Sequence, residues 1–117
     1  MSFTQLGSEI NGEDSFDYSG HSVSLSADGS IVAIGANYND GNGDRLGHVR
    51  LFAWNGSDWV QRGSDIDGES ASDLSGSSVS LSADGSIVAI GAPYNANDNG
   101  SNSGHVRLYA WNGSAWV

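Results

Sequence analysis

Apolar and polar residues alternate along several short stretches of the chain. In residues 22–26 every second residue is apolar, as in a strand with one buried face. Residues 31–36 are apolar on both faces, which predicts a central strand, and residues 49–54 and 59–62 predict two further strands. Asp-Gly and Asn-Gly, the dipeptides of tight hairpins, stand between these stretches. No long run has the apolar spacing of a helix, so the pattern predicts an all-β chain.

The whole pattern occurs twice. Residues 22–36 recur without change as residues 78–92, which is a shift of 56 positions. His-Val-Arg-Leu at residues 48–51 recurs at residues 105–108, a shift of 57, so one residue has been added in the loop before it. Four antiparallel strands in a repeat of this length match one blade of a β-propeller.

The point of the four-strand unit at which the chain begins determines how the chain divides into blades. Residues 3–10 align with the fourth-strand segment at 59–66, so the chain opens with an outer strand that has no blade before it. We therefore predict that residues 1–117 form a two-blade propeller fragment. Its parts are the orphan outer strand at 3–10, a first four-stranded blade at 16–66, and a second blade at 72–117 that lacks most of its outer strand.

Two blades cannot bury their own apolar faces, because each face of a blade packs on another blade. Every large aliphatic side chain left in water forfeits roughly 1.5–3 kcal/mol. We therefore predict a propeller ring closed by homo-oligomerisation, with the orphan strand exchanged between subunits. Propellers of about six or eight blades correspond to three or four chains, and three are preferred.

The net charge of the chain argues against two classes of binding partner. Fourteen acidic and four basic residues give a net charge of −10. This balance argues against nucleic acid and against anionic membrane surfaces, since both are bound through Lys and Arg. The absence of cysteine excludes disulfides and thiolate metal sites. The chain has neither the pattern of a signal peptide at its start nor an apolar run long enough to span a membrane.

Several short motifs in order carry a family resemblance. Residues 17–26, then Ile-Gly-Ala at 34–36 and Gly-His-Val-Arg-Leu-Phe at 47–52, resemble an FG-GAP repeat. Residues 54–59 resemble the closing segment of the bacterial version of this repeat. The resemblance implies an integrin-α-like propeller that serves mainly in adhesion and ligand binding, in an extracellular location.

The chain departs from the FG-GAP pattern at two places. Ser19 and Ser75 stand where the family has Phe before Gly. The loop at residues 27–30 holds one carboxylate, whereas Ca²⁺ takes six to eight oxygen ligands. The metal site of integrin-type repeats is therefore not carried over to this chain.

Two other groups of residues are candidate binding sites. The loop at residues 37–44 places oxygen ligands at near-alternate positions, so it is either a calcium loop or a turn-rich connection. Its candidate calcium ligands are Asn39, Asp40, Asn42 and Asp44. Four tryptophans flank the Asn-Gly-Ser hairpins, and they either pack between blades or form a stacking platform for sugars. These candidate ligand-binding residues are Trp54, Trp59, Trp111 and Trp116.

The remaining chemistry-bearing residues do not form a catalytic pattern. His48 and His105 occupy equivalent positions at a strand start, which favours a structural role. Acidic residues near the start of each blade recur in the other copy, as in a repeated loop. These pairs are Glu9 with Asp65, Glu13 with Glu69, and Asp17 with Asp73. We predict that the chain is not an enzyme and needs no cofactor, unless calcium binds.

These observations predict a non-enzymatic binding or adhesion-type module that works as a multivalent homo-oligomeric β-propeller. Its partners would be copies of itself and a glycan or protein ligand. One alternative is a carbohydrate-binding lectin. A second is a structural fragment, natural or designed, of a longer repetitive propeller with no ligand of its own.

Overall fold

The computed structural model describes residues 3–38, 46–70, 72–95 and 103–117. These residues form strands and turns without any helix, which confirms the all-β prediction. Accordingly, no helix in the described ranges is long and apolar enough to cross a membrane. The strands are β1 (Ser19–Leu25), β2 (Ile31–Ala36), β3 (His48–Trp54), β4 (Trp59–Gln61), β5 (Ile66–Asp67), β6 (Ser78–Leu81), β7 (Ile87–Ala92) and β8 (His105–Ala110).

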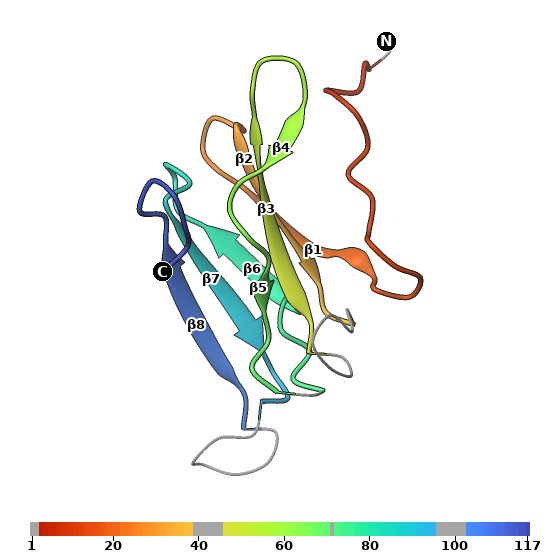
Figure 1. The fold of residues 1–117 in the computed structure, drawn as a ribbon, viewed down its shortest axis with the longest axis vertical. Helices are drawn as coiled ribbons and strands as arrows, with labels where there is room; N and C mark the ends of the chain where they lie inside the picture. The colour runs from red at the N-terminus through yellow and green to blue at the C-terminus, as the bar shows by residue number, and fades with distance from the viewer. Residues whose placement is uncertain (1–2, 39–45, 71, 96–102) are drawn as a thin grey trace.

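The strands form two antiparallel sheets (Figure 1). The first has the order β1-β2-β3-β4, with β5 also paired to β3, and the second has the order β6-β7-β8. The register repeats between them: Ala33 pairs with Leu51 in the first sheet, and Ala89 pairs with Leu108 in the second. We call the first sheet blade 1 and the second blade 2. The structure contains no closed propeller, so ring closure stays a prediction.

The fourth strand of each blade is incomplete in a different way. In blade 1 it is interrupted between β4 and β5 at residues 62–65, where Gly63 takes a positive φ of 82°. In blade 2 only its beginning is present, as an isolated bridge between Trp111 and Trp116. The Val117 amide donates a 2.9 Å hydrogen bond to the Ala110 carbonyl, which continues this bridge.

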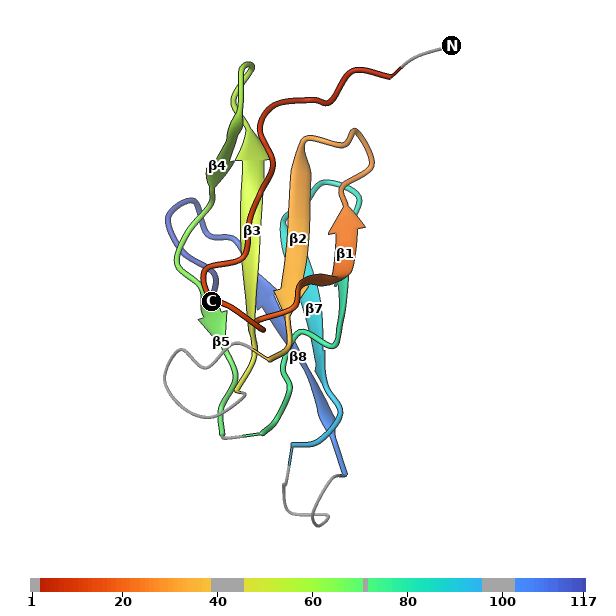
Figure 2. The same cartoon turned by 90° about the vertical axis from the view of Figure 1, so that its right-hand side faces the viewer.

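Residues 3–10, predicted as an outer strand, form no strand in the single chain. A strand needs the free edge of a neighbouring strand, and in the predicted ring that edge belongs to blade 2 of another copy. The strand therefore stays a prediction for the assembly. Within the chain, this segment lies apart from the strands of blade 1 in Figure 1 and in front of β3 in Figure 2, and the Trp59 indole of β4 donates a hydrogen bond to its Leu6 carbonyl.

The two sheets lie against each other (Figures 1 and 2), and an apolar core of described residues lies between them. Alternate residues of β2, β3 and β7 supply most of it, because successive side chains of a strand point to opposite faces, and β5 adds Ile66. The core consists of Ile31, Ala33, Val49, Leu51, Ile66, Val88 and Ile90.

Candidate functional site

The contact between the blades uses one face of each sheet. Ile31, Val49 and Leu51 of blade 1 pack in the same buried cluster as Val88 and Ile90 of blade 2. In this contact, the side of blade 1 that carries Val49 and Leu51 faces the side of blade 2 that carries Val88 and Ile90. Because the two copies share their sequence, this internal contact indicates what each face packs against.

The outer face of blade 2 lacks such a cover. Val49 and Leu51 of blade 1 are 0% exposed, but their counterparts Val106 and Leu108 are 62% and 65% exposed. Ile87 on the same face is also exposed. We call the face formed by Ile87, Val106 and Leu108 the following face.

The outer face of blade 1 also has exposed apolar residues, and they are counterparts of residues on the other side of the contact between the blades. Val23 and Leu25 are 62% and 59% exposed. Their counterparts in blade 2, Val79 and Leu81, are half-buried against the core. We call the surface around Val23 and Leu25 the preceding face. Each open face thus matches one side of the contact that the chain makes internally.

The N-terminal segment lies on blade 1 as the end of the first copy lies on blade 2. Arg50 Nη2 donates a 2.9 Å hydrogen bond to the Asn11 carbonyl, and Arg107 Nη2 donates one of 2.8 Å to the Asp67 carbonyl. Asn11 and Asp67 are equivalent positions of the repeat. Residues 3–11 therefore occupy the place that the outer strand of a preceding blade would occupy.

The tryptophans predicted as ligand-binding residues form two pairs. The ring centroids of Trp54 and Trp59 lie 5.3 Å apart, and those of Trp111 and Trp116 lie 5.2 Å apart. The Trp116 indole donates to the Arg62 carbonyl over 2.9 Å, and the Trp59 indole donates to the Leu6 carbonyl over 3.0 Å.

Each pair covers one glycine of the adjoining segment. An added Cβ at Gly63 would lie 2.9 Å from ring atoms of both Trp111 and Trp116, and Gly7 lies in the same way under the other pair. These contacts agree with packing between successive blades, the first of the two interpretations. Binding of a sugar by the tryptophans stays a prediction.

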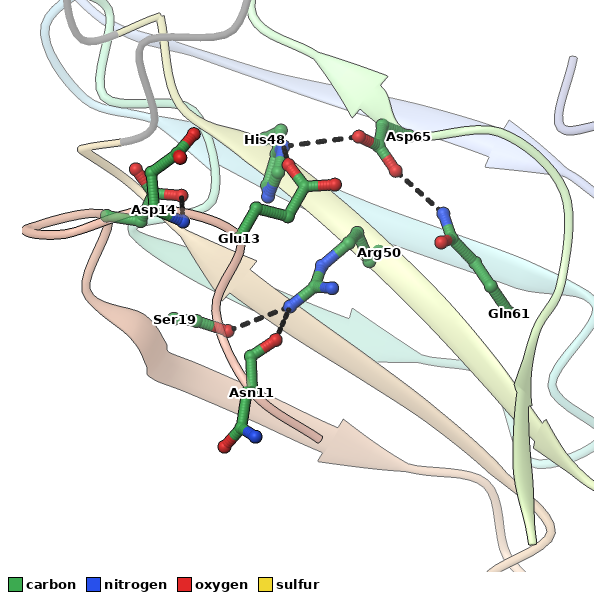
Figure 3. A network of polar contacts seen from close by, with 9 residues as sticks. Asn11, Glu13, Asp14, Ser19, His48, Arg50, Gln61 and Asp65 are labelled. Carbon is green, nitrogen blue, oxygen red and sulfur yellow. Dashed lines mark hydrogen bonds and ion pairs between the residues drawn. The ribbon is translucent and has the colours of Figure 1, made fainter. Parts of the chain in front are cut away.

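The predicted calcium ligands Asn39, Asp40, Asn42 and Asp44 lie outside the described residues. A different cluster lies within them, at the start of β3 (Figure 3). His48 Nδ1 is 3.6 Å from Asp65 Oδ2 and 3.8 Å from Glu13 Oε1. Both distances exceed the 2.7–3.2 Å typical of a hydrogen bond.

Blade 2 has a related cluster of Glu69, Asp73 and His105. His105 Nδ1 is 3.8 Å from Glu69 Oε1. Sequence reasoning missed both clusters, because it treated the histidines and the acids separately. The usable signal was that a glutamate before β1 and a histidine opening β3 recur together in the second copy.

Charge accumulates around the first cluster. The pKa of Asp67 is raised above its ordinary value. Burial is the largest cause, the neighbouring His48 partly opposes it, and the Asp65 carboxylate adds to it. The other oxygen of Asp65 accepts a 2.7 Å hydrogen bond from Gln61 Nε2, which orients that carboxylate (Figure 3). The carboxylates of Glu13 and Asp65 therefore face the His48 imidazole, and Asp67 lies near it.

An open aromatic cleft of about 460 Å³ lies between loops of the two blades. Tyr18, Tyr38, Pro93 and Tyr94 line it, and the rings of Tyr18 and Tyr38 are 4.8 Å apart. Asn37 Oδ1 is buried at this cleft and has no hydrogen-bond partner among the described residues. The cleft can therefore accept an apolar or sugar ring together with one hydrogen-bond donor.

The fold and these contacts define a tandem β-repeat protein in which one sheet packs face to face on its copy. Residues 65–109, from the end of the first copy through most of β8, match the model of the FG-GAP repeat. This match confirms the resemblance drawn from the motifs, and it supports a β-rich module of the binding or adhesion type. No curated protein matches the chain.

Proposed function

We propose that the chain is a non-enzymatic binding module of the adhesion type, whose copies pack head to tail into a closed β-propeller ring. One observation carries this proposal: Val49, Leu51, Val79 and Leu81, which pack between blade 1 and blade 2, have counterparts that are more than half exposed, namely Val106, Leu108, Val23 and Leu25. The following face of one copy would pack on the preceding face of the next, as blade 1 packs on blade 2.

The free energy available from this contact is substantial. Val106, Leu108, Val23 and Leu25 are each more than half exposed. Burying each such aliphatic side chain stabilises the assembly by roughly 1.5–3 kcal/mol. The two faces differ, so the contact is heterologous, and such a contact closes into a ring when the rotation from copy to copy divides the full circle. Three or four copies would complete it, and three are preferred.

Strand exchange would complete blade 2 in the ring. In blade 1, Ile66 pairs with Val49 and Asp67 pairs with His48. By the same register, Ile10 and Asn11 of the next copy would pair with Val106 and His105. Residues 5–11 would then continue the outer strand that begins at Trp116, because Phe3 and Thr4 are equivalent to Trp116 and Val117.

Molar mass measured by light scattering tests the ring. The expected mass is three or four times the 12.1 kDa of one chain. Leu108→Lys is expected to give monomers, because it places a charge in the proposed contact. Ser114→Lys carries the same charge on an exposed hairpin and is expected to assemble like the original chain. A folded 12.1 kDa particle from the unaltered chain would contradict the proposal.

A lectin is the second candidate function, and the tyrosine-lined cleft favours it. A ring would repeat this cleft in every copy, so weak single sites would add up to useful avidity. A glycan array probed with the assembled protein tests this function, with Tyr94→Ala as the comparison because Tyr94 is exposed at the cleft. Binding that the variant loses supports the lectin, and no binding to any glycan removes it.

A further inference from the structure

The cluster at the start of β3 joins three segments that are far apart in the sequence (Figure 3). Glu13 comes from the loop before β1, His48 opens β3, and Asp65 lies in the interruption between β4 and β5. Their nearest ligand atoms all lie within 4.8 Å of one another. Carboxylate oxygens and an imidazole nitrogen are the donors that borderline divalent metals prefer.

His48 provides an independent indication of a ligand at this cluster. The residue is only 1% exposed, and its Nδ1 points between Glu13 and Asp65. It makes no hydrogen bond there, because the two separations are 3.6 and 3.8 Å. Nδ1 is within ion-pair range of both carboxylates, while the other ring nitrogen, Nε2, is buried without a hydrogen-bond partner among the described residues, which is costly. A cation between the three side chains would use Nδ1 and both carboxylates.

We propose that Glu13, His48 and Asp65 bind a divalent transition-metal ion of the zinc class. Zn²⁺ binds nitrogen and oxygen at about 2.0–2.2 Å in a tetrahedron, which places its ligand atoms about 3.3–3.6 Å apart. The two separations from His48 are already near this spacing. Glu13, which is 43% exposed, has the freedom to complete it.

The donor set selects against calcium and magnesium. Both ions take oxygen ligands, and a buried imidazole nitrogen in the centre of the site does not serve them. Three protein ligands leave one position of a tetrahedral ion open for water or for a ligand group. His48 Nε2 is buried without an acceptor, so burial alone orients the ring, and the site lacks the outer hydrogen bond found at most metal-bound histidines.

The bound ion would clamp the loop before β1, the start of β3 and the end of the outer strand. It would also offset the negative charge of Glu13, Asp65 and the nearby Asp67. The clamp is complete within one chain, so it does not depend on the proposed ring. Loss of metal binding and loss of assembly are therefore separate outcomes.

Calorimetric titration with zinc chloride tests the site in the full-length chain. His105→Ala serves as the background, because it disables the related cluster in blade 2. We expect saturable binding of one Zn²⁺ per chain. Glu13→Gln and Asp65→Asn in this background are each expected to weaken binding by tenfold or more, because each removes a direct ligand and loss of an outer group alone costs about tenfold to a hundredfold.

Asp14→Asn is the matched control, because it removes the same charge beside Glu13, and binding is expected to stay unchanged. Thermal unfolding gives a second measurement: Zn²⁺ is expected to raise the melting temperature of the background, while Ca²⁺ and Mg²⁺ are not. The absence of saturable zinc binding, or equal affinity in the Glu13→Gln, Asp65→Asn and Asp14→Asn variants, would overturn the proposal.

Discussion

At the scale of single residues, the clearest dependence is that of the tryptophan pairs on the glycine beneath them. Gly63 combines a positive φ of 82° with close contact to Trp111 and Trp116. Gly56, in the Asn-Gly hairpin, has a positive φ of 103° but no atom near the position of a Cβ. The two glycines share the backbone requirement and differ in the packing requirement.

Gly63→Ala is therefore expected to destabilise the chain more than Gly56→Ala. The backbone strain costs each variant roughly 1–2 kcal/mol. Gly63→Ala must in addition displace two indole rings, which costs about 1–3 kcal/mol more. Chemical unfolding followed by tryptophan fluorescence measures both variants. Equal loss of stability in the two would mean that the rings do not pack tightly on Gly63.

Asp28 at the β1–β2 turn gives a prediction about pH. The Ser30 hydroxyl, the Ser30 amide and then the Ser26 hydroxyl bond to its carboxylate and hold the pKa of Asp28 below the ordinary value of 3.8. The stabilisation from this carboxylate is thus present above pH 3.8 and is lost as the pH falls through the lowered pKa.

Ser30→Ala is expected to raise the pKa of Asp28 toward 3.8, because it removes the strongest of these hydrogen bonds. A carboxyl NMR titration measures the change. Ser57→Ala removes a hydroxyl that bonds to the non-ionisable Asn55 in the other hairpin of blade 1, so it should leave the pKa of Asp28 unchanged. An Asp28 pKa that is the same with and without the Ser30 hydroxyl would refute this account.

These residues also separate what the sequence could predict from what it could not. The Asp-Gly turn at Asp28 follows from a local rule of backbone geometry, so sequence alone was enough to place it. The Glu13–His48–Asp65 cluster depends on where three distant segments meet. No local pattern encodes that meeting, and an imidazole at a strand start has the same sequence signal whether or not carboxylates face it.

At the scale of secondary-structure elements, the N-terminal segment is held to blade 1 by a contact that blade 2 lacks. Asp58, in the hairpin before β4, accepts hydrogen bonds from the Ser8 amide at 3.0 Å and the Ser8 hydroxyl at 3.1 Å. The Ser8 amide, followed by that of Trp59, lowers the pKa of Asp58. The equivalent residue in blade 2 is Ala115.

Asp58→Ala would make the first hairpin resemble the second, and it is expected to speed hydrogen exchange of the Ser8 amide. Ala115→Asp is the reciprocal change in blade 2, where Ser64 is the counterpart of Ser8 and borders the same cleft as Ala115. It is expected to slow hydrogen exchange of the Ser64 amide. Asp84→Ala is the control, because it removes the same charge from a carboxylate that bonds to Ser82 and Ser86 rather than to Ser8 or Ser64. An unchanged Ser8 amide in Asp58→Ala would show that other contacts hold the segment.

The strands themselves were predicted where alternation or an apolar run marked them, as in β2 and its copy β7. β5 was not separated from β4, because a two-residue strand has no period and is defined only by its pairing with β3. The break between the two follows from Gly63, whose positive φ turns the chain out of the ladder. Residues 3–10 have the pattern of a strand but lack a partner edge within the chain.

At the scale of the whole molecule, the proposed ring rests on two faces that differ from each other. Such a contact has a direction, so blocking one face leaves the other able to bind. Leu108→Lys blocks the following face, and Val23→Lys blocks the preceding face. Because the chain carries a net charge of −10, an added lysine lowers the repulsion between copies. Loss of assembly in either variant would therefore reflect the altered face.

Each variant alone is expected to be monomeric, because every contact in the ring needs both faces. An equimolar mixture has one usable pair: the intact following face of the Val23→Lys chain and the intact preceding face of the Leu108→Lys chain. The mixture is thus expected to stop at a heterodimer of twice 12.1 kDa, measured by light scattering or sedimentation. A chain with both substitutions has neither face and is expected to stay monomeric when it is mixed with either single variant. If one variant alone formed dimers, the contact would be symmetric, and a symmetric contact joins two copies without building a ring.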